Sequence, residues 1–409
     1  MSRCTTSRRE RGSVLLTATV VTLLATMLVM SLAHEAGLRL EARQMLRYGA
    51  AALAVAQAGL EAGARKATAS TTWRSDPTTW LSQRAVGDGA VDVTASDPAD
   101  GHVEVSGALG SSSADGVRLT ASASVRGLTR VLRADYLPLP HAALGSAVYS
   151  QTYVRIQGVG VEGRVRANGD VLDYGAASVR GDITTLTGST VSPTLDDADT
   201  DVFYTASGLA IPAVGFAWFQ AAGERISLPV SRVISNTRIT TSYNPYGSAS
   251  ARGIYWIDAG GGDVLLSQVA IQACLAVLNA RTVNVCTSLG APTAFSHHSP
   301  DPDRLPAMVV QGDLKMRVEG GVSIVLMVGS APVSYASGLQ GVFFCTGNFQ
   351  GPQLDCATPI TVDGAFLGNT VSLVGPGTLV RHDPNLNLYP VVEMTRPGLR
   401  LVPDTTLEL

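Results

Sequence analysis

Histidine and acidic side chains that could do chemistry gather at two places in this 409-residue chain. His297 and His298 stand close to Asp301 and Asp303, a donor set that could ligate a metal. The prolines around them favour an exposed loop. The stretch Asp196–Asp201 offers clustered carboxylates of the kind Ca²⁺ prefers, yet it lacks the glycine and the closing Glu of an EF-hand loop. A solvated acidic turn is the simpler interpretation, so we expect no metal and no cofactor.

A further group of carboxylates could serve sugar hydrolysis. Asp170, Asp173 and Asp182 lie in an arginine-rich segment, and paired carboxylates are the usual catalytic groups of glycosidases. Asp after Gly is also a common turn residue, and nothing marks these residues above the other turns. The chain shows no Gly-x-Ser-x-Gly elbow, P-loop or nucleotide fingerprint. We therefore expect a protein that is not an enzyme.

Four of the five cysteines fall late in the chain. They are Cys274, Cys286, Cys345 and Cys356, whereas Cys4 lies near the N-terminus. In a protein segment outside the cytoplasm, an even number of cysteines suggests disulfides. Three connectivities are open, and the pairs closest in sequence are the simplest choice. Because no Cys-x-x-Cys occurs, a zinc site has little support.

The overall composition is that of an extended β protein. Charged residues make up 15% of the chain and glycine contributes 42 residues, which predicts many turns and short strands. The net charge is −3, so there is no overall basic field for nucleic acid.

The elements that position these residues begin with an apolar helix. Ser13–Ala33 carries no charge, and about 20 such residues suffice to cross a bilayer. The leader 1–12 is rich in arginine, so the N-terminus should stay cytoplasmic and the body should be periplasmic or extracellular. We assign 13–33 to a single transmembrane helix and 34–69 to its periplasmic continuation.

Small residues follow one face of this continuation at three- and four-residue steps. Such a stripe lets helix backbones approach closely, so it could dock neighbouring helices or pack on the protein's own body. Both interpretations stay open from periodicity alone. The candidate docking residues are Gly49, Ala52, Ala56, Gly59 and Gly63.

Two N-terminal motifs resemble one known family. Arg11-Gly12-Ser13-Val14-Leu15-Leu16 with its apolar helix, and Ala56-Gln57-Ala58-Gly59-Leu60-Glu61-Ala62, resemble the PilX-like minor pilins of the type IV pilin and pseudopilin class. The resemblance implies cleavage between Gly12 and Ser13 by a prepilin peptidase, storage in the inner membrane, and other pilin subunits as partners.

One position departs from that family. Thr17 stands at the fifth mature position, where most pilins carry a Glu that pairs with a neighbour's N-terminal amine. The departure favours a tip or priming role over a place in the filament shaft.

A rival interpretation of the same stretch remains. Ser31-Leu32-Ala33 has the small residues that signal peptidase prefers. Cleavage after Ala33 would release a secreted β-helical carbohydrate-active enzyme or adhesin.

The rest of the chain predicts α+β structure followed by mostly β structure. Residues 70–137 alternate at period two between turn clusters, typical of an antiparallel meander that covers the helix. Residues 138–409 repeat a Gly-Asp-apolar step, which favours a right-handed parallel β-helix over a jelly roll or sandwich. Residues 192–252 fit poorly and suggest an irregular insertion. The C-terminal part also resembles PilX-like proteins, more weakly, and a surface or saccharide ligand for it stays unidentified.

Overall fold

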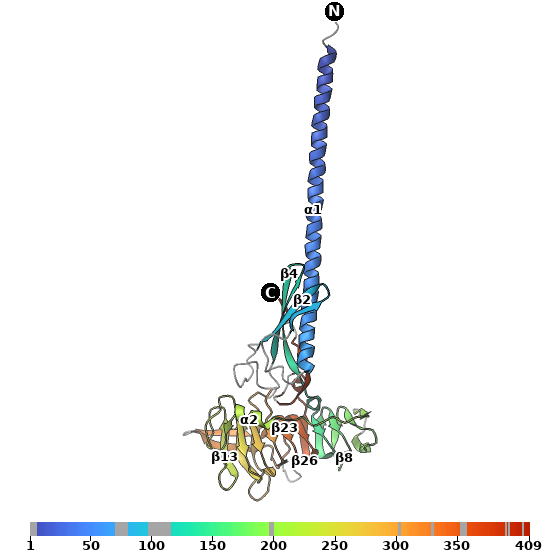
Figure 1. Cartoon of the computed structure of the whole chain (residues 1–409). Coiled ribbons are helices and arrows are strands. Elements are labelled where there is room, and N and C mark those ends of the chain that lie inside the picture. Colours follow the sequence, from blue (N-terminus) through green and yellow to red (C-terminus); the bar gives the residue numbers. More distant parts are fainter. Residues whose placement is uncertain are drawn as a thin grey trace, which may run out of the picture.

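The computed structural model describes residues 6–69, 81–96, 116–195, 200–301, 304–328, 331–351, 358–388, 391, 393–402 and 405–409. Figure 1 shows three parts: one long helix, a small sheet on the distal half of that helix, and a β-rich body that lies crosswise beyond them. A long N-terminal helix followed by a mostly β remainder confirms the coarse fold predicted from the sequence.

Helix α1 (Thr6–Ala69) is continuous over 64 residues. At 1.5 Å per residue this corresponds to about 96 Å. No proline interrupts the stretch, and Ala, Leu and Arg, which are strong helix formers, dominate it. Exposed pairs such as Glu35–Arg39 add about 0.2–0.5 kcal/mol to local helix stability.

A small sheet covers the distal half of α1, and we call this sheet together with residues 47–67 the head. Its first four strands pair antiparallel in chain order: β1 (Leu81–Val86), β2 (Gly89–Ser96), β3 (Val117–Val125) and β4 (Leu128–Pro140). Alternation in β2 and β3 points Val91, Val93 and Leu119 inward, where they are buried against Ala52 and Ala56 of α1. Each buried Val or Leu contributes about 1.5–3 kcal/mol.

The head sheet is completed by the end of the chain. β27 (Thr395–Leu401) and β28 (Leu407–Glu408) both pair antiparallel with β4. The sequence assigned these residues to the second domain, 138–409, and the structure places them in the first sheet. The reason is that β4 is long and offers a second edge, which β27 and β28 fill from far along the chain. The body is therefore inserted between β4 and β27.

The body is built from three columns of parallel strands. The first column faces the head. It contains β5 (Val148–Ser150), β7 (Val165–Ala167), β10 (Ile183–Leu186), β11 (Val202–Thr205), β12 (Glu224–Arg225), β14 (Ile254–Asp258), β16 (Cys274–Leu278), β19 (Met308–Val310), and parts of β23 (Gly338–Cys345) and β25 (Thr361–Gly368).

The second and third columns share several long strands that bend at a corner. The second column contains β8 (Val171–Asp173), β17 (Thr282–Val285), β20 (Asp313–Met316) and β24 (Asn348–Gly351), with parts of β6 (Val154–Glu162), β13 (Val233–Thr240), β15 (Val264–Gln272) and β26 (Thr370–Arg381). The third contains β9 (Ser178–Arg180) and β18 (Phe295–His298), with the remaining parts of β6, β13, β15, β23, β25 and β26.

The chain enters this stack in its middle. It coils outward from β5 to β11, crosses to the opposite end through α2 (Phe216–Ala222), and coils back from β12 to β26. There β26 pairs with β6, its neighbour in space although far away in sequence. The stretch 192–252, expected to be an irregular insertion, thus supplies β11, β12 and β13 at the two ends of the stack, in addition to α2.

Glycines make the tight corners possible. Gly312 has φ +145°, and a Cβ there would lie 2.1 Å from the carbonyl oxygen of Ala280 in the coil beneath. Gly181 sits over Gly163 in the same manner, with φ +143° and a Cβ position 2.8 Å from the Gly163 carbonyl oxygen. The Gly-Asp-apolar step of the sequence therefore marks places where one coil's backbone rests on the next.

Two apolar cores hold the body together. The interior of the stack is filled by aliphatic side chains and an aromatic cluster in which Phe349 and Phe366 stack with ring centroids 4.4 Å apart. A second core lies between the first column, α2 and the segments that join the body to the head, with Tyr149, Phe219 and Leu386 among its members. A hairpin, β21 (Ser323–Val328) with β22 (Ala331–Ala336), contacts β13, β15 and β18 of the stack.

Candidate functional site

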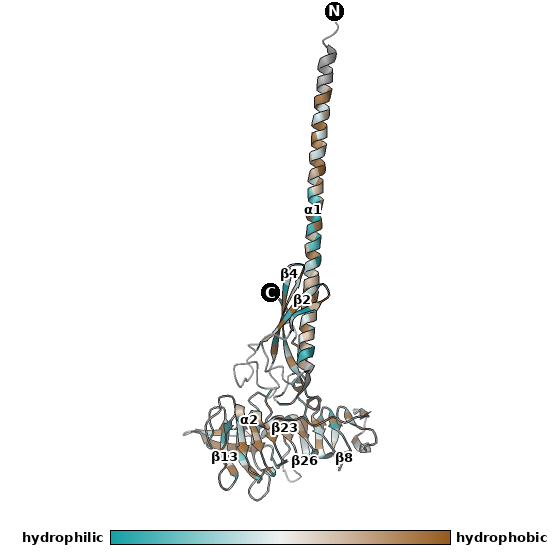
Figure 2. Ribbon diagram, in the orientation of Figure 1, coloured by the Kyte–Doolittle hydropathy of each residue, from teal (hydrophilic) through white to brown (hydrophobic). Residues whose placement is uncertain are grey.

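The N-terminal half of α1 has the character of a membrane-spanning segment. Within the described part of the chain, one helix is long and apolar enough to cross a membrane, as judged by length and composition. Its side chains from Val14 to Leu46 are exposed in this single chain, and Figure 2 shows the apolar residues concentrated toward the N-terminal end. This half of the helix is compatible with single-pass anchoring.

Threonine hydroxyls in this segment bond to the helix itself. Thr19 donates to the carbonyl oxygen of Leu15 at 2.8 Å, and Thr22 donates to that of Ala18 at 2.7 Å. Such bonds satisfy the hydroxyls without water, as an apolar surrounding requires. Gly12 and Ser13 lie within α1 near its start, and Thr17 follows on the same helix.

The small-residue stripe packs on the protein's own sheet. Gly49, Ala52, Ala56, Gly59 and Gly63 are all buried, and Ala52 and Ala56 are fully so. β2, β3 and β4 contact this face of α1, which corresponds to the second of the two interpretations left open by the sequence, packing on the protein's own body. The spacing of the small residues could not distinguish a neighbouring helix from the protein's own sheet, since small side chains let either of them approach the backbone of α1 closely.

A groove opens where α1 leaves the head. Its volume is about 510 Å³, and it lies between α1 and the β1–β2 and β3–β4 turns. Ala51, Ala54 and Val125 contribute apolar surface, whereas Arg47 and Arg126 bring positive charge. The groove thus combines an apolar wall with two basic side chains and the acidic side chain of Asp88, next to the exposed half of the helix.

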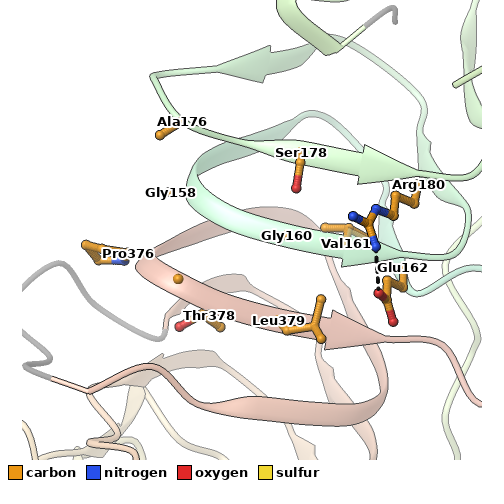
Figure 3. Close-up of a pocket in the computed structure, with 11 residues that line it drawn as sticks. Gly158, Gly160, Val161, Glu162, Ala176, Ser178, Arg180, Pro376, Thr378 and Leu379 are labelled. Atoms are coloured by element: carbon orange, nitrogen blue, oxygen red, sulfur yellow. Dashed lines mark hydrogen bonds and ion pairs between the residues drawn. The ribbon is translucent and has the colours of Figure 1, made fainter. Parts of the chain in front are cut away.

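A shallow hollow of about 460 Å³ lies on the third column (Figure 3). It forms because Gly160 leaves room between Ser178 and Leu379 on the neighbouring coils. Beside it Glu162 accepts hydrogen bonds from Arg180 at 3.5 Å and from Arg381 at 3.1 Å.

Asp363 is a fourth member of this row of ion pairs, because Arg381 also contacts its carboxylate at 3.3 Å. The row was not predicted from the sequence. Glu162–Arg180 and Asp363–Arg381 each join consecutive coils 18 residues apart, but the Glu162–Arg381 contact that connects them spans 219 residues of sequence. A strand alignment that paired β6 with β26 could have found it.

The acidic candidates for hydrolysis are engaged in turns and ion pairs. Asp170 accepts from the Thr190 N–H at 2.7 Å, and Asp173 accepts from the Thr194 hydroxyl at 2.7 Å. Asp182 pairs with Arg164 at 2.8 Å. Their contacts fix the corners of the coils. Within Asp196–Asp201, residues 196–199 lie outside the described residues, and Asp201 is exposed.

The two histidines lie in a strand, not in the exposed loop predicted from the prolines. His297 is fully buried in β18, where its Nε2 lies 3.0 Å from the carbonyl oxygen of Ala273 and its ring meets Phe295 and Phe343 edge-on. Burial, with a smaller effect of neighbouring His298, lowers the pKa of His297 to about 3. His297 is therefore a neutral core residue. Among the described residues no group of three or more His, Cys, Asp or Glu side chains is placed to hold a metal ion.

The described cysteines carry free thiols. Cys274 belongs to the core beneath α2 and Cys345 to the interior of the stack, so their side chains point to opposite faces of the first column. The predicted pairing of Cys274 with Cys286 does not form, since Cys286 lies beyond the end of β17 in the second column. Cys356 lies outside the described residues. Burial raises the pKa of the Cys274 and Cys345 thiols.

Comparisons with known proteins give little similarity. No family model matches the chain, and no curated protein matches it. The competence-associated pilin ComZ from Thermus thermophilus aligns over 88% of this chain and 98% of its own, at 10% identity and a TM-score of 0.30. The DUF3494 domain of a Shewanella frigidimarina ice-binding protein aligns over 60% of this chain and 98% of its own, at 10% identity and a TM-score of 0.23. At such low scores neither likeness establishes a shared fold or function.

Proposed function

We propose that this chain is a membrane-anchored, PilX-like minor pilin or pseudopilin that takes part in the assembly of a type IV pilus or a secretion-type filament. One observation carries the proposal. A single helix is exposed and apolar in its first half, and in its second half it is buried under an antiparallel sheet of the same chain. That is the layout the resemblance of the N-terminal motifs implies for a pilin.

The anchoring and processing steps follow from the helix. The arginine-rich leader keeps the N-terminus in the cytoplasm, so the head and the body are outside the inner membrane. A prepilin peptidase cleaves between Gly12 and Ser13. With Thr17 in place of the usual Glu, the subunit acts at the tip or in priming. Contacts with other pilin subunits use the exposed part of α1 before the head, where no strand of the described chain covers the helix.

The body serves recognition and not catalysis in this proposal. The carboxylates examined as candidate hydrolytic groups hold coil corners, and the body projects away from the membrane on the far side of the head. Its exposed surfaces, including the hollow beside Glu162, are available to a surface or saccharide ligand.

The test is the N-terminal residue of the mature protein, measured by mass spectrometry on isolated membranes. The proposal expects Ser13. A matched pair sharpens it, because Gly12→Val should abolish cleavage whereas Gly37→Val, at an open position of the same helix, should leave it unchanged. An N-terminal His34 would point to signal peptidase and to the rival secreted enzyme or adhesin. An intact N-terminus would contradict prepilin processing.

A further inference from the structure

The last coil of the body leaves a strand edge open. β11 pairs with β10 on one side, and no described strand pairs with its other side. Phe203 and Tyr204 are 49% and 55% exposed there, although both are large aromatic residues. An open strand edge presents unpaired N–H and C=O groups, and natural proteins usually protect it.

The hydrogen bonds to β10 determine which groups point outward. The Ile183 N–H donates to the Asp201 carbonyl and the Thr187 N–H donates to the Thr205 carbonyl. Because backbone groups alternate along a strand, Phe203 also directs its N–H and C=O toward β10. The N–H and C=O groups of Val202 and Tyr204 therefore point to the open side.

We propose that β11 pairs antiparallel with β11 of a second copy of this chain, joining two bodies end to end. In an antiparallel pair, two residues that lie opposite each other either both direct their backbone N–H and C=O groups toward the other strand or both direct them away from it. The register that satisfies this over the whole strand sets Val202 opposite Tyr204 of the second copy, and Phe203 opposite Phe203. The two phenylalanines then form a cross-strand aromatic pair on the two-fold axis.

Charge permits this pairing. The exposed Asp201 falls opposite Thr205 of the second copy, so the two Asp201 carboxylates stand at opposite ends of the pair. Their separation along the strands is about 13 Å at about 3.3 Å per residue, which exceeds the Debye length of about 8–10 Å.

The membrane anchor permits it as well. The two-fold axis of such a pair is normal to the first column. The outer face of that column packs on α2 and on the segments that lead to the head, and α1 extends from the head away from the body (Figure 1). The axis therefore runs roughly along α1, so both helices of the dimer enter the same membrane. Confinement to one membrane raises the effective concentration of the two copies.

Disulfide trapping of the full-length protein in membranes tests the pairing. In Phe203→Cys, opposite cysteines lie about 4.5–5.5 Å apart between Cα atoms, within disulfide reach. Mild oxidation should convert most of the protein to a covalent dimer. Tyr204→Cys is the matched control, because it has similar exposure but faces Val202. The wild type reports the background from native cysteines.

Absence of trapping in Phe203→Cys, or equal trapping in both variants, would overturn the proposal. Trapping in Tyr204→Cys alone would overturn it too, since the register would be different.

A second measurement does not depend on oxidation. Phe203→Lys sets two like charges opposite each other and should shift the full chain in detergent from dimer to monomer, as judged by light scattering. Val230→Lys, at a fully exposed position between β12 and β13 at the other end of the stack, should leave the dimer intact. Equal dissociation by both variants, or a monomeric wild type, contradicts the proposal. Neither result depends on cleavage at Gly12, so this inference and the proposed pilin function succeed or fail separately.

Discussion

Gly59 of α1 lies directly beneath Val91 of β2. A Cβ at this glycine would stand 2.6 Å from Cγ2 of Val91 and 3.3 Å from Cγ2 of Val93. The close approach of the helix to its own sheet thus depends on a missing side chain.

Gly59→Ala should therefore destabilise the head by about 1–3 kcal/mol, because overpacking at this contact exceeds the gain in helix propensity. Thermal unfolding of the full chain in detergent measures the effect. Gly37→Ala is the control, since nothing lies within 4 Å of its Cβ position, and it should be neutral or stabilising by up to about 1 kcal/mol. A neutral Gly59→Ala would contradict the packing described for the head.

The corner glycines of the body give a second prediction. Gly312→Ala should cost more than 1 kcal/mol (roughly 1–3), because the backbone beneath cannot yield and φ is positive there. Gly175→Ala has a more comparable φ of +119° but nothing within 4 Å of its Cβ position, so it should lose only the conformational part of that cost. Urea unfolding of the two variants separates the steric effect from the conformational one, and equal losses would argue against the stacked-coil contact.

The buried histidine predicts acid sensitivity. His297 has a folded pKa of about 3, well below the ordinary 6.5, so below pH 6.5 the unfolded chain binds a proton that the folded chain excludes. Its contribution to stability is complete above pH 6.5 and is lost progressively as the pH falls toward 3. The urea concentration at which half of the wild type is unfolded should decrease when the pH is lowered from 7 to 4.5.

His297→Gln should be less stable at pH 7 but should lose less on acidification. His298→Gln, one residue along, is the control and should keep the wild-type pH dependence. If His297→Gln retained the full acid-induced loss, the titrating group would lie elsewhere.

Ion pairs in the head and in the body should differ in their contributions to stability. Arg118 holds Asp135 with two hydrogen bonds of 2.7 Å between β3 and β4, and the side chains are 28% and 19% exposed. Asp135→Asn should cost about 1.5–3 kcal/mol. Glu162→Gln, in the more exposed row beside the hollow, should cost about 0–1 kcal/mol, and added salt should diminish that cost. Unfolding at low and high salt compares the two, and the reverse order would contradict the assigned burial.

The thiols should differ in reactivity. Cys274 and Cys345 are fully buried, and burial raises their pKa values, so neither should be alkylated in the native protein. The half-buried Cys286 should react slowly, and all three should react in denaturant. Peptide mass spectrometry after alkylation identifies the sites. A native protein that resists alkylation at Cys286 because the residue is oxidised would contradict the free thiol.

The features that the sequence predicted well are local. Absence of proline and the uncharged run from Ser13 identified α1, and period-two alternation around Val91 and Leu119 identified strands that pack on it. Gly-Asp steps located the coil corners. The handedness of the coils stays a prediction.

The features that it did not predict are non-local. Pairing of β26 with β6 and return of β27 to β4 join segments more than 200 residues apart, and no local pattern encodes such a register. Prolines around His297 suggested a loop, but four residues between them suffice for one buried strand. The small residues around Gly59 were compatible with packing on a neighbouring helix or on the protein's own sheet, and the sequence alone did not distinguish these two partners.

Insertion of the body between β4 and β27 has a consequence for biosynthesis. Residues 141–394 must be synthesised before β27 can reach β4. Throughout that interval the outer edge of β4 is unpaired and able to associate with other chains. β27 and β28 therefore complete the head sheet late, and a chaperone that covers the β4 edge would be of use until these two strands have been synthesised.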